Sequence, residues 1–302
     1  MLSHLANLRV HGRLERNVPL APLTSWRVGG PADWLFEPDD ADDLAHLLAS
    51  IPEEVPRMVL GLGSNVLIRD GGVEGLVIHL AGSMNQRLRL DPERVELGAG
   101  LACPQAARFC ASEGLTGAEF LAGIPGTVGG ALAMNAGAWG GEIWPLVEWA
   151  ETIDARGLRH LRTPSDLEIG YRSVRGCEGQ FFLRAVLRLQ PGDPTAARMR
   201  IQELLRERAE KQPLGLPSCG SVFRNPEGRH AAALIEQAGL KGLHRGGAEV
   251  SRKHANFITH DGSATAADIE WLIQEVQSRV ADRFHIRLVP EVRVIGRREG
   301  HL

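Results

Sequence analysis

The sequence predicts an α/β protein, because strand-like and helix-like segments alternate along its first third. The acidic pair at 39–40 can cap a helix with leucines on one face, and RMVL at 57–60 follows as a buried strand. The chain has 302 residues, of which 43% are hydrophobic, so it can bury a large core and divide into two or three domains.

Further elements follow in order. GLVIHL at 75–80 and RVELGAG at 94–100 indicate strands, and Pro104 begins a helix that runs to about Ser112. Residues 149–161 indicate a hairpin with its turn at 155–157. Thr163-Pro164 with Asp166 favours a helix start, and residues 180–189 form another long strand.

Three helices are expected after Leu189. QPGDP interrupts the chain after Leu189, so we place a domain boundary near Pro191, and an amphipathic helix follows. Another helix is expected around 231–238, closed by Gly239. The longest helix carries an apolar stripe typical of a core-facing surface: Ile269, Leu272, Ile273, Val276, Val280 and Phe284.

Composition excludes several classes of protein. A net charge of -3 provides no general field for nucleic acid. No apolar run approaches the roughly 18 residues of a membrane span, and the N-terminus lacks a signal-peptide core, so we expect a cytoplasmic protein without membrane association. The four cysteines lack C-x-x-C spacing, which predicts no metal site and no structural disulfide.

Two glycine-rich segments are candidate ligand sites. GLGSNVLIRDGG at 61–72 can present several backbone N–H groups to an anion, although a tight structural turn explains it equally well. IPGTVGGALAMNAGAWGGEI at 124–143 suits either backbone packed on a large ligand or close packing of chain on chain. Together they suggest one extended ligand with a central diphosphate, such as a dinucleotide cofactor.

An ordered set of motifs adds a more specific indication. GLGSNVLIRDGG, GIPGTVGGALAMNAGAWGGEI, YRS, KQPLGLPSCGSVFRNP, LIEQAGLKG, GGAEVSRKHANFI and PEVRVIG run from about Thr24 to Gly296. In this order they resemble the UDP-N-acetylenolpyruvoylglucosamine reductase family. Only QPGDP separates the strand ending near 189 from the next helix, so the chain resembles the branch that lacks a tyrosine-bearing lid.

The resemblance implies a vanillyl-alcohol-oxidase-type FAD-binding fold of two subdomains, at 1–80 and 81–191, plus a C-terminal α/β substrate-binding domain at 192–302. The last strand, near 288–296, would return to the active site. FAD would be bound without a covalent link, since GLGSN offers no histidine or cysteine. The positions implied for FAD are Gly61, Gly63, Ser64, Asn65, Ile124, Pro125, Gly126, Thr127, Gly129, Gly130, Asn135 and Gly137.

The implied activity is reduction of the enolpyruvyl ether of UDP-N-acetylglucosamine to UDP-N-acetylmuramate for peptidoglycan synthesis, with NADPH as hydride donor. Arg172 and Glu291 would stabilise the enolate, and Ser221 would deliver the proton. Glu291 either donates as a neutral acid or stays ionised and orients Arg172. Cys219, two residues from Ser221, is a candidate for sensitivity to thiol reagents.

Substrate contacts are implied at Tyr171, Lys211 and Asn225. Two other functions are compatible with these residues: an oxidase that passes electrons to oxygen, and a nucleotide-sugar binding protein without flavin. Intact GLGSN and GTVGG segments favour a flavoenzyme over the second of these. The oligomeric state does not follow from the sequence, and a monomer is plausible.

Overall fold

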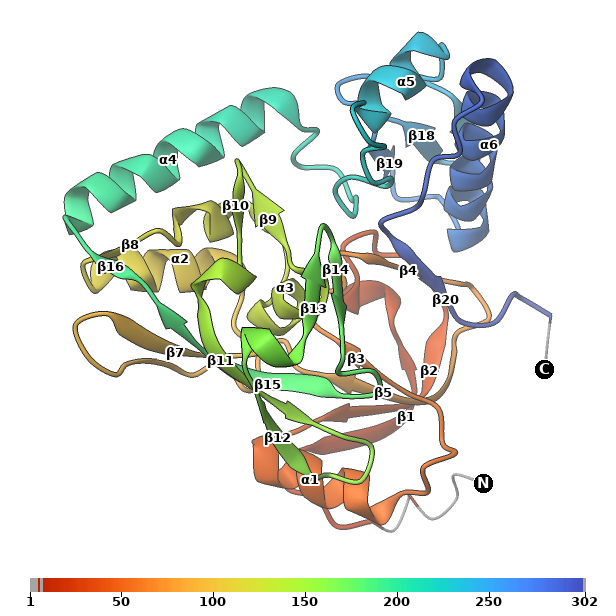
Figure 1. Cartoon of the computed structure of the whole chain (residues 1–302). Coiled ribbons are helices and arrows are strands. Elements are labelled where there is room, and N and C mark those ends of the chain that lie inside the picture. Colours follow the sequence, from red (N-terminus) through yellow and green to blue (C-terminus); the bar gives the residue numbers. More distant parts are fainter. Residues whose placement is uncertain (1–4, 6–7, 301–302) are drawn as a thin grey trace. The chain divides into compact units, whose positions relative to one another are not determined.

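The computed structural model describes residue 5 and residues 8–300, and it confirms the mixed α/β class (Figure 1). The α-helices within these residues are α1 (Ala41–Ser50), α2 (Cys103–Ser112), α3 (Val128–Met134), α4 (Pro194–Lys211), α5 (Ala231–Gln237) and α6 (Ala266–Phe284). The chain forms two compact units. The first unit consists of the chain up to Glu15, Trp34–Leu62 and Gly75–Arg208. The second unit consists of Arg16–Asp33, Gly63–Glu74 and the chain from Ala209 onward.

A four-stranded sheet carries the helix predicted after the acidic pair. Its strands are β1 (Arg13–Pro19), β2 (Pro31–Glu37), β5 (Val73–His79) and β3 (Arg57–Leu60), in that spatial order, and β3 runs parallel to β5. The Asp40 carboxylate caps α1 by accepting from the N–H groups of Asp42 and Asp43. The leucine face of α1 is buried in the core with Phe36 and Ile78, as predicted.

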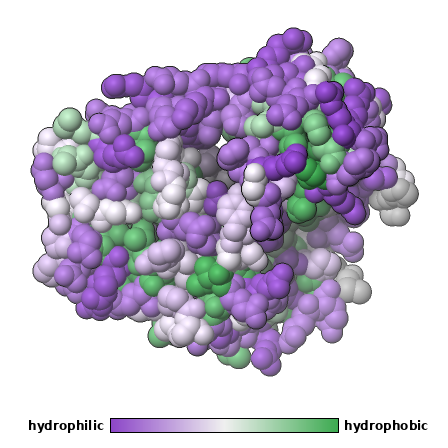
Figure 2. Space-filling model, turned by 45° about the horizontal axis from the view of Figure 1, so that its top comes forward, coloured by the Kyte–Doolittle hydropathy of each residue, from purple (hydrophilic) through white to green (hydrophobic). Residues whose placement is uncertain are grey.

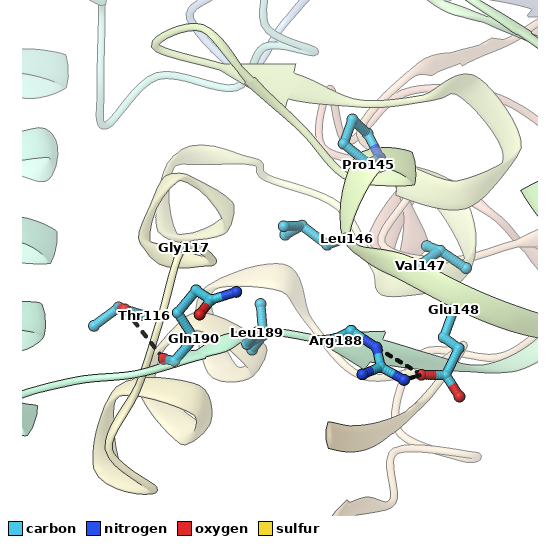
Figure 3. A pocket seen from close by; sticks show the side chains of 9 residues that line it. All are labelled: Thr116, Gly117, Pro145, Leu146, Val147, Glu148, Arg188, Leu189 and Gln190. Atoms are coloured by element: carbon cyan, nitrogen blue, oxygen red, sulfur yellow. Dashed lines mark hydrogen bonds and ion pairs between the residues drawn. The ribbon is translucent and has the colours of Figure 1, made fainter. Parts of the chain in front are cut away.

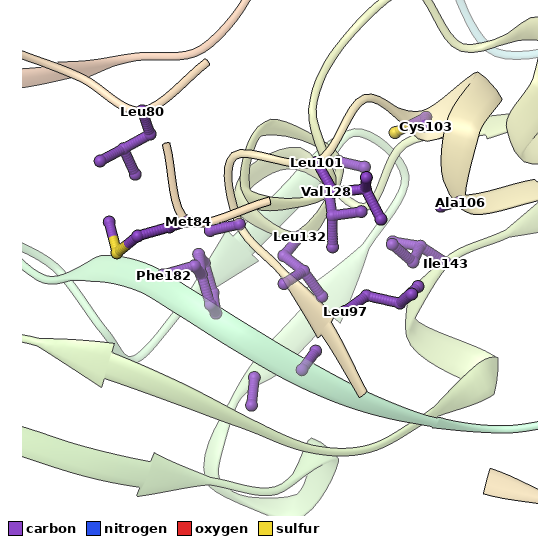
Figure 4. Close-up of a cluster of buried hydrophobic side chains, with 14 of the residues drawn as sticks. Leu80, Met84, Leu97, Leu101, Cys103, Ala106, Val128, Leu132, Ile143 and Phe182 are labelled. Carbon is purple, nitrogen blue, oxygen red and sulfur yellow. The ribbon is translucent and has the colours of Figure 1, made fainter. Parts of the chain in front are cut away.

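A five-stranded antiparallel sheet contributes to the same core in the first unit. Its order is β12 (Arg159–Arg162), β11 (Val147–Ile153), β15 (Phe181–Arg188), β7 (Arg94–Gly98) and β6 (Arg87–Arg89). Helix α3 packs against β15 and β7. Figure 4 shows part of the resulting cluster, in which Leu97, Val128 and Phe182 are buried. Both strand predictions and the hairpin prediction for this region are confirmed.

Two expectations for the first unit need adjustment. The helix start at Thr163 produces only a single 3₁₀ turn, η5 (Pro164–Asp166), because no apolar periodicity follows the cap. Helix α4 begins after the predicted break, but its Ala197 and Ile201 join the core of the first unit, which therefore extends to Arg208. The three-domain division with a boundary near Pro191 stays a proposal.

The second unit has a small antiparallel sheet, β17 (His244–Arg245), β18 (Ala248–Val250) and β19 (Ile258–His260), and a parallel pair, β4 (Val66–Ile68) with β20 (Arg293–Ile295). The predicted stripe of α6 is buried from Ile269 to Val280, and Phe284 is half-buried against it. Gly239, with φ of 75°, follows α5 as expected.

Shorter elements complete the chain. The two-stranded pairs are β8 (Leu115–Thr116) with β16 (Gln190–Pro191), β9 (Gly137–Ala138) with β10 (Gly141–Glu142), and β13 (Glu168–Gly170) with β14 (Ser173–Arg175). Besides η5, the 3₁₀ turns that lie wholly within residues 8–300 are η2 (Ala21–Leu23), η3 (Glu119–Gly123) and η4 (Trp144–Leu146). Residues 189–193 alone join β15 to α4, so the predicted short connection is confirmed.

The visible face in Figure 2 is mostly hydrophilic, with hydrophobic side chains in separate patches. No helix among the described residues is long and apolar enough to cross a membrane.

Candidate functional site

The two glycine-rich segments meet in the first unit at Gly61 and Thr127. A Cβ on Gly61 would lie 2.6 Å from Thr127 Oγ1, so only glycine fits at the end of β3. Thr127 is the N-cap of α3, and its Oγ1 accepts from the N–H of Gly130 over 3.3 Å. Residues far apart in the sequence thus lie side by side, as expected if both segments serve one ligand.

Much of the backbone of the second segment is committed to the fold. The N–H of Val128 donates to the Leu101 carbonyl over 2.8 Å, and that of Gly129 donates to Ala99 over 2.9 Å. Gly130 differs, because it is exposed and, among the described residues, a Cβ there would approach only Thr127 Oγ1, at 3.6 Å. The open backbone at Gly130, beside the Thr127 hydroxyl, is compatible with a bound FAD.

Asn135 ends α3 in the left-handed conformation, with φ of 46°, and is buried. Its Nδ2 donates to Glu142 Oε2 over 2.8 Å and to the Gly170 carbonyl over 3.2 Å, and its Oδ1 accepts from the Trp144 N–H over 3.4 Å. The Asn135 side chain therefore ties α3 to the β13–β14 hairpin. Its predicted contact with FAD stays a prediction.

Arg172 lies in the two-residue loop of the β13–β14 hairpin, directly after Tyr171. Its guanidinium donates from Nη1 to the Asn135 carbonyl over 3.3 Å and from Nη2 to the Gly137 carbonyl over 2.7 Å. Arg172 Cζ also lies 5.3 Å from the centroid of the Tyr171 ring. The backbone after α3 thus orients the Arg172 guanidinium, for which the family resemblance predicts a contact with the enolate.

The backbone of Arg172 is strained. Its φ of 51° is in the left-handed region, which favours glycine at this loop position. Such conformations persist where the surrounding structure determines them, and they gather at functional sites. Here the two hydrogen bonds from the Arg172 guanidinium to backbone carbonyls help to hold the residue in this conformation.

The GLGSN loop continues into the second unit. Gly63 has a φ of 58°, and a Cβ there would lie 2.4 Å from the Leu23 carbonyl oxygen, so glycine is required by the turn itself. Asn65 Nδ2 donates to the Glu291 carbonyl over 3.2 Å, while the Asn65 carbonyl accepts from the N–H of Arg293 over 3.0 Å. The loop is therefore attached to the predicted returning strand.

Ser221 and Glu291 lie on neighbouring backbone segments of the second unit. The N–H of Glu291 donates to the carbonyl of Val222, the residue after Ser221, over 2.8 Å. Phe223 pairs with Pro290 in an antiparallel bridge, which fixes the register of the two segments. Gly220, with φ of 72°, provides the turn before Ser221. The backbone segments of Ser221 and Glu291 are therefore neighbours, and both residues are half-buried; their catalytic roles stay a prediction.

The buried Cys219 side chain, two residues before Ser221, packs against the backbone of the GLGSN loop and β4. Its Sγ lies 3.6 Å from the Gly63 carbonyl oxygen and 3.4 Å from that of Val66. Burial raises the pKa of the Cys219 thiol to about 12, so the reactive thiolate is scarce at neutral pH. The expected sensitivity to thiol reagents is therefore not supported at this cysteine.

The predicted substrate contacts are exposed. Tyr171 is 52% exposed, and Lys211 is the last residue of α4. Asn225 Oδ1 accepts from the N–H of Ala231, the first residue of α5, over 3.0 Å. No group of three or more His, Cys, Asp or Glu side chains in the described part of the chain could hold a metal ion.

A pocket of about 370 Å³ in the first unit contains none of the predicted site residues. Figure 3 shows its lining, where Arg188 Nη2 and Glu148 Oε2 pair over 2.6 Å and the Thr116 hydroxyl donates to the Gln190 carbonyl. The Arg188 and Glu148 side chains in its lining form an ion pair with each other, so we do not assign this pocket to the predicted reduction.

Sequence reasoning missed Asn256, which lies within the quoted HANFI motif. Its buried side chain is hydrogen-bonded to the backbone of Phe223, two residues after Ser221. The only available signal was its membership of that motif.

The chain is similar to known proteins over most of its length. Residues 212–295 match the family model described as UDP-N-acetylenolpyruvoylglucosamine reductase, C-terminal domain, and residues 32–161 match the FAD binding domain. The UDP-N-acetylenolpyruvoylglucosamine reductase of Alkalilimnicola ehrlichii is 53% identical over 285 residues, which cover 94% of this chain and 95% of that protein. This chain belongs to the UDP-N-acetylenolpyruvoylglucosamine reductase family.

Other members of the reductase family support the same placement. The reductase of Methylococcus capsulatus is 53% identical over 278 residues, covering 92% of this chain and 91% of that protein. The crystal structure of the Thermus caldophilus reductase aligns with a TM-score of 0.82 at 36% identity, covering 94% of this chain and all of that one. The predicted family is confirmed, and with it an oxidoreductase that carries an FAD-binding domain.

Proposed function

We propose that this reductase family member converts the enolpyruvyl ether of UDP-N-acetylglucosamine to UDP-N-acetylmuramate, a step of peptidoglycan precursor synthesis in the cytoplasm, with NADPH as electron donor. The backbone pairing of the Ser221 and Glu291 segments, in a chain 53% identical to a named reductase, is the observation that carries this proposal. When bound, FAD would supply the hydride to the terminal carbon of the enolpyruvyl group, and Gly61, Thr127 and Gly130 would hold it.

Arg172 has the role of stabilising negative charge on the substrate carboxylate. A planar guanidinium can bind both carboxylate oxygens, and it keeps its charge when water is excluded. Its two contacts with backbone carbonyls use part of its donor capacity and fix its orientation. A cation fixed in advance loses little free energy to reorganisation when charge develops.

Ser221 donates the proton that completes the reduction. The carbon next to the carboxylate becomes strongly basic once the hydride has been added, so a weak acid can protonate it if its oxygen is well placed. The left-handed turn at Gly220 and the backbone pairing after Ser221 support such a role, because they fix the backbone on both sides of Ser221. Tyr171, Lys211 and Asn225 contact the substrate, and Lys211 supplies local positive charge for its diphosphate.

Glu291 has two candidate roles, which a Gln variant separates. A neutral Glu291 would donate a hydrogen bond to the enolate, and Gln can replace that donor. An ionised Glu291 would act through its charge, which Gln lacks. Retained activity in Glu291→Gln therefore supports the neutral donor, whereas severe loss supports the carboxylate.

The proposed function is tested by following its two half-reactions, reduction of the flavin and its reoxidation by substrate, one after the other. The purified protein is mixed anaerobically with NADPH, and the flavin absorbance is followed until it bleaches. UDP-N-acetylglucosamine enolpyruvate is then added. Rapid return of the absorbance with formation of UDP-N-acetylmuramate would support the proposal; a protein that stays bleached with this acceptor, or is reoxidised faster by oxygen, would contradict it. A colourless preparation without releasable flavin would favour the binding-protein alternative.

A further inference from the structure

Asn256 is a buried polar residue between β18 and β19, and its contacts converge on one short stretch of backbone. Its Nδ2 donates to the Phe223 carbonyl over 2.8 Å, and its Oδ1 accepts from the Phe223 N–H over 3.0 Å. The Asn256 carbonyl also accepts from the N–H of Val222 over 2.8 Å. Three hydrogen bonds from one residue therefore hold the two residues that follow Ser221.

The opposite edge of the same backbone carries the Glu291 segment. The Val222 carbonyl accepts from the N–H of Glu291 over 2.8 Å, and the N–H of Arg224 donates to the Val289 carbonyl over 2.9 Å. The Asn256 amide thus acts as a neighbouring strand would, supplying one donor and one acceptor to Phe223. With both edges bonded, the backbone after Ser221 has little freedom to move.

We propose that Asn256 is a positioning residue for Ser221, holding the Ser221 hydroxyl where its proton is delivered. This rests on the proposed function, because it assigns Asn256 to the proton-donating half of the reaction. Asn256 touches no reacting atom in this role and acts through the backbone of Val222 and Phe223. Displacement of a reacting group by about 1 Å can slow a reaction by about 100-fold, so loss of this contact has a measurable kinetic consequence.

The test is a double-mutant cycle between Asn256→Ala and Ser221→Ala, with the two half-reactions followed separately by stopped flow. In the wild-type background, Asn256→Ala is expected to slow the return of flavin absorbance with the enolpyruvyl substrate by about 10- to 100-fold, mainly through kcat. Bleaching by NADPH is expected to change less than about twofold, because it needs no proton from Ser221. In the Ser221→Ala background, Asn256→Ala should cause no further slowing.

Other patterns would overturn the proposal. Equal slowing of both half-reactions, or an undiminished effect in the Ser221→Ala background, would assign Asn256 to general stability of the second unit. Thr259→Val is the matched control, since Thr259 is also buried and lies three residues away, and it should leave the half-reactions unchanged. If Asn256→Ala does not fold, Asn256→Asp keeps the acceptor for the Phe223 N–H and should give the same pattern. Failure of the proposed function itself would already appear in the wild-type protein.

Discussion

Arg172 Nη2 donates to the carbonyl oxygen of Gly137 over 2.7 Å, so the cation assigned to the enolate is held by the backbone of the second glycine-rich segment. This contact gives the segment a function that is independent of any cofactor. Small residues there allow the chain after α3 to turn and present two carbonyls to one guanidinium.

Arg172→Lys tests that arrangement. Lysine keeps the charge but cannot donate to two carbonyls and a carboxylate with a planar fork. We expect kcat for substrate reduction to fall by about 100- to 1,000-fold, with NADPH-driven bleaching unchanged. Arg175→Lys is the control, since Arg175 is exposed on the same hairpin and should tolerate the change. Wild-type kcat in Arg172→Lys would exclude a bidentate role.

Asn135 supports the same hairpin, and two substitutions separate its contacts from its backbone conformation. Both Asn135→Ala and Asn135→Gly lose the bonds to Glu142 and Gly170, but only alanine is strained at a φ of 46°. We expect the glycine variant to be more stable by about 1 kcal/mol, measured by urea unfolding. Equal stability of the two variants would mean that the left-handed conformation is not retained.

Ser221→Ala should slow only one of the two half-reactions of the catalytic cycle. Flavin bleaching by NADPH is expected to stay near the wild-type rate, while transfer to the enolpyruvyl substrate slows by about 100- to 10,000-fold, because a positioned proton donor contributes on this scale. Ser218→Ala, three residues earlier, serves as the control. Equal losses in the two half-reactions would remove Ser221 as the specific donor.

Some of these relationships were readable from the sequence and others were not. The stripe of α6 and the leucine face of α1 follow from helical spacing and side-chain chemistry, so they were predicted. The strands β1 and β2 were not, because their mixed burial gives no clean alternation. The overestimated helix at Thr163 shows that a capping pair without a following apolar repeat stabilises only one turn.

The candidate site likewise contains some relationships that the sequence predicted and others that it did not. The motifs predicted Ser221 and Glu291, and the structure joins their segments by backbone hydrogen bonds. The contacts of Asn135 and Asn256 could not be predicted, because they depend on carbonyls and N–H groups that only the folded chain brings near. Backbone groups have the same chemistry in every residue, so sequence carries little information on which of them meet.

Cys219 should be inert in the native protein. Burial raises its pKa to about 12, and the same cause raises the pKa of Cys103 and Cys110 to about 12. We expect iodoacetamide at neutral pH to modify only the half-buried Cys177, with no loss of activity, as measured by mass spectrometry and turnover. The Cys177→Ser variant should then take up no label. Rapid labelling of Cys219 would show that its segment opens readily.

The Arg69–Glu270 pair predicts a pH dependence of stability in the second unit. Arg69 donates to both carboxylate oxygens of Glu270 over 2.9 Å, and this hydrogen bonding lowers the pKa of Glu270 below its ordinary value of 4.5. The pair therefore stabilises the fold fully above about pH 4.5, and its contribution is lost as the pH falls through the lower, folded-state pKa. Glu270→Gln should cost about 1–3 kcal/mol at neutral pH. That cost should shrink on acidification.

Glu275→Gln provides the comparison on the same helix. Glu275 pairs with Arg279 over 2.7 Å, but the Arg279 side chain is 49% exposed, so the pair is screened by water and its loss should cost about 0.5 kcal/mol or less. Urea unfolding of both variants and the wild type between neutral and acid pH measures the difference. A cost for Glu270→Gln that stays constant down to low pH would mean that packing, rather than the ionised carboxylate, accounts for the stabilisation.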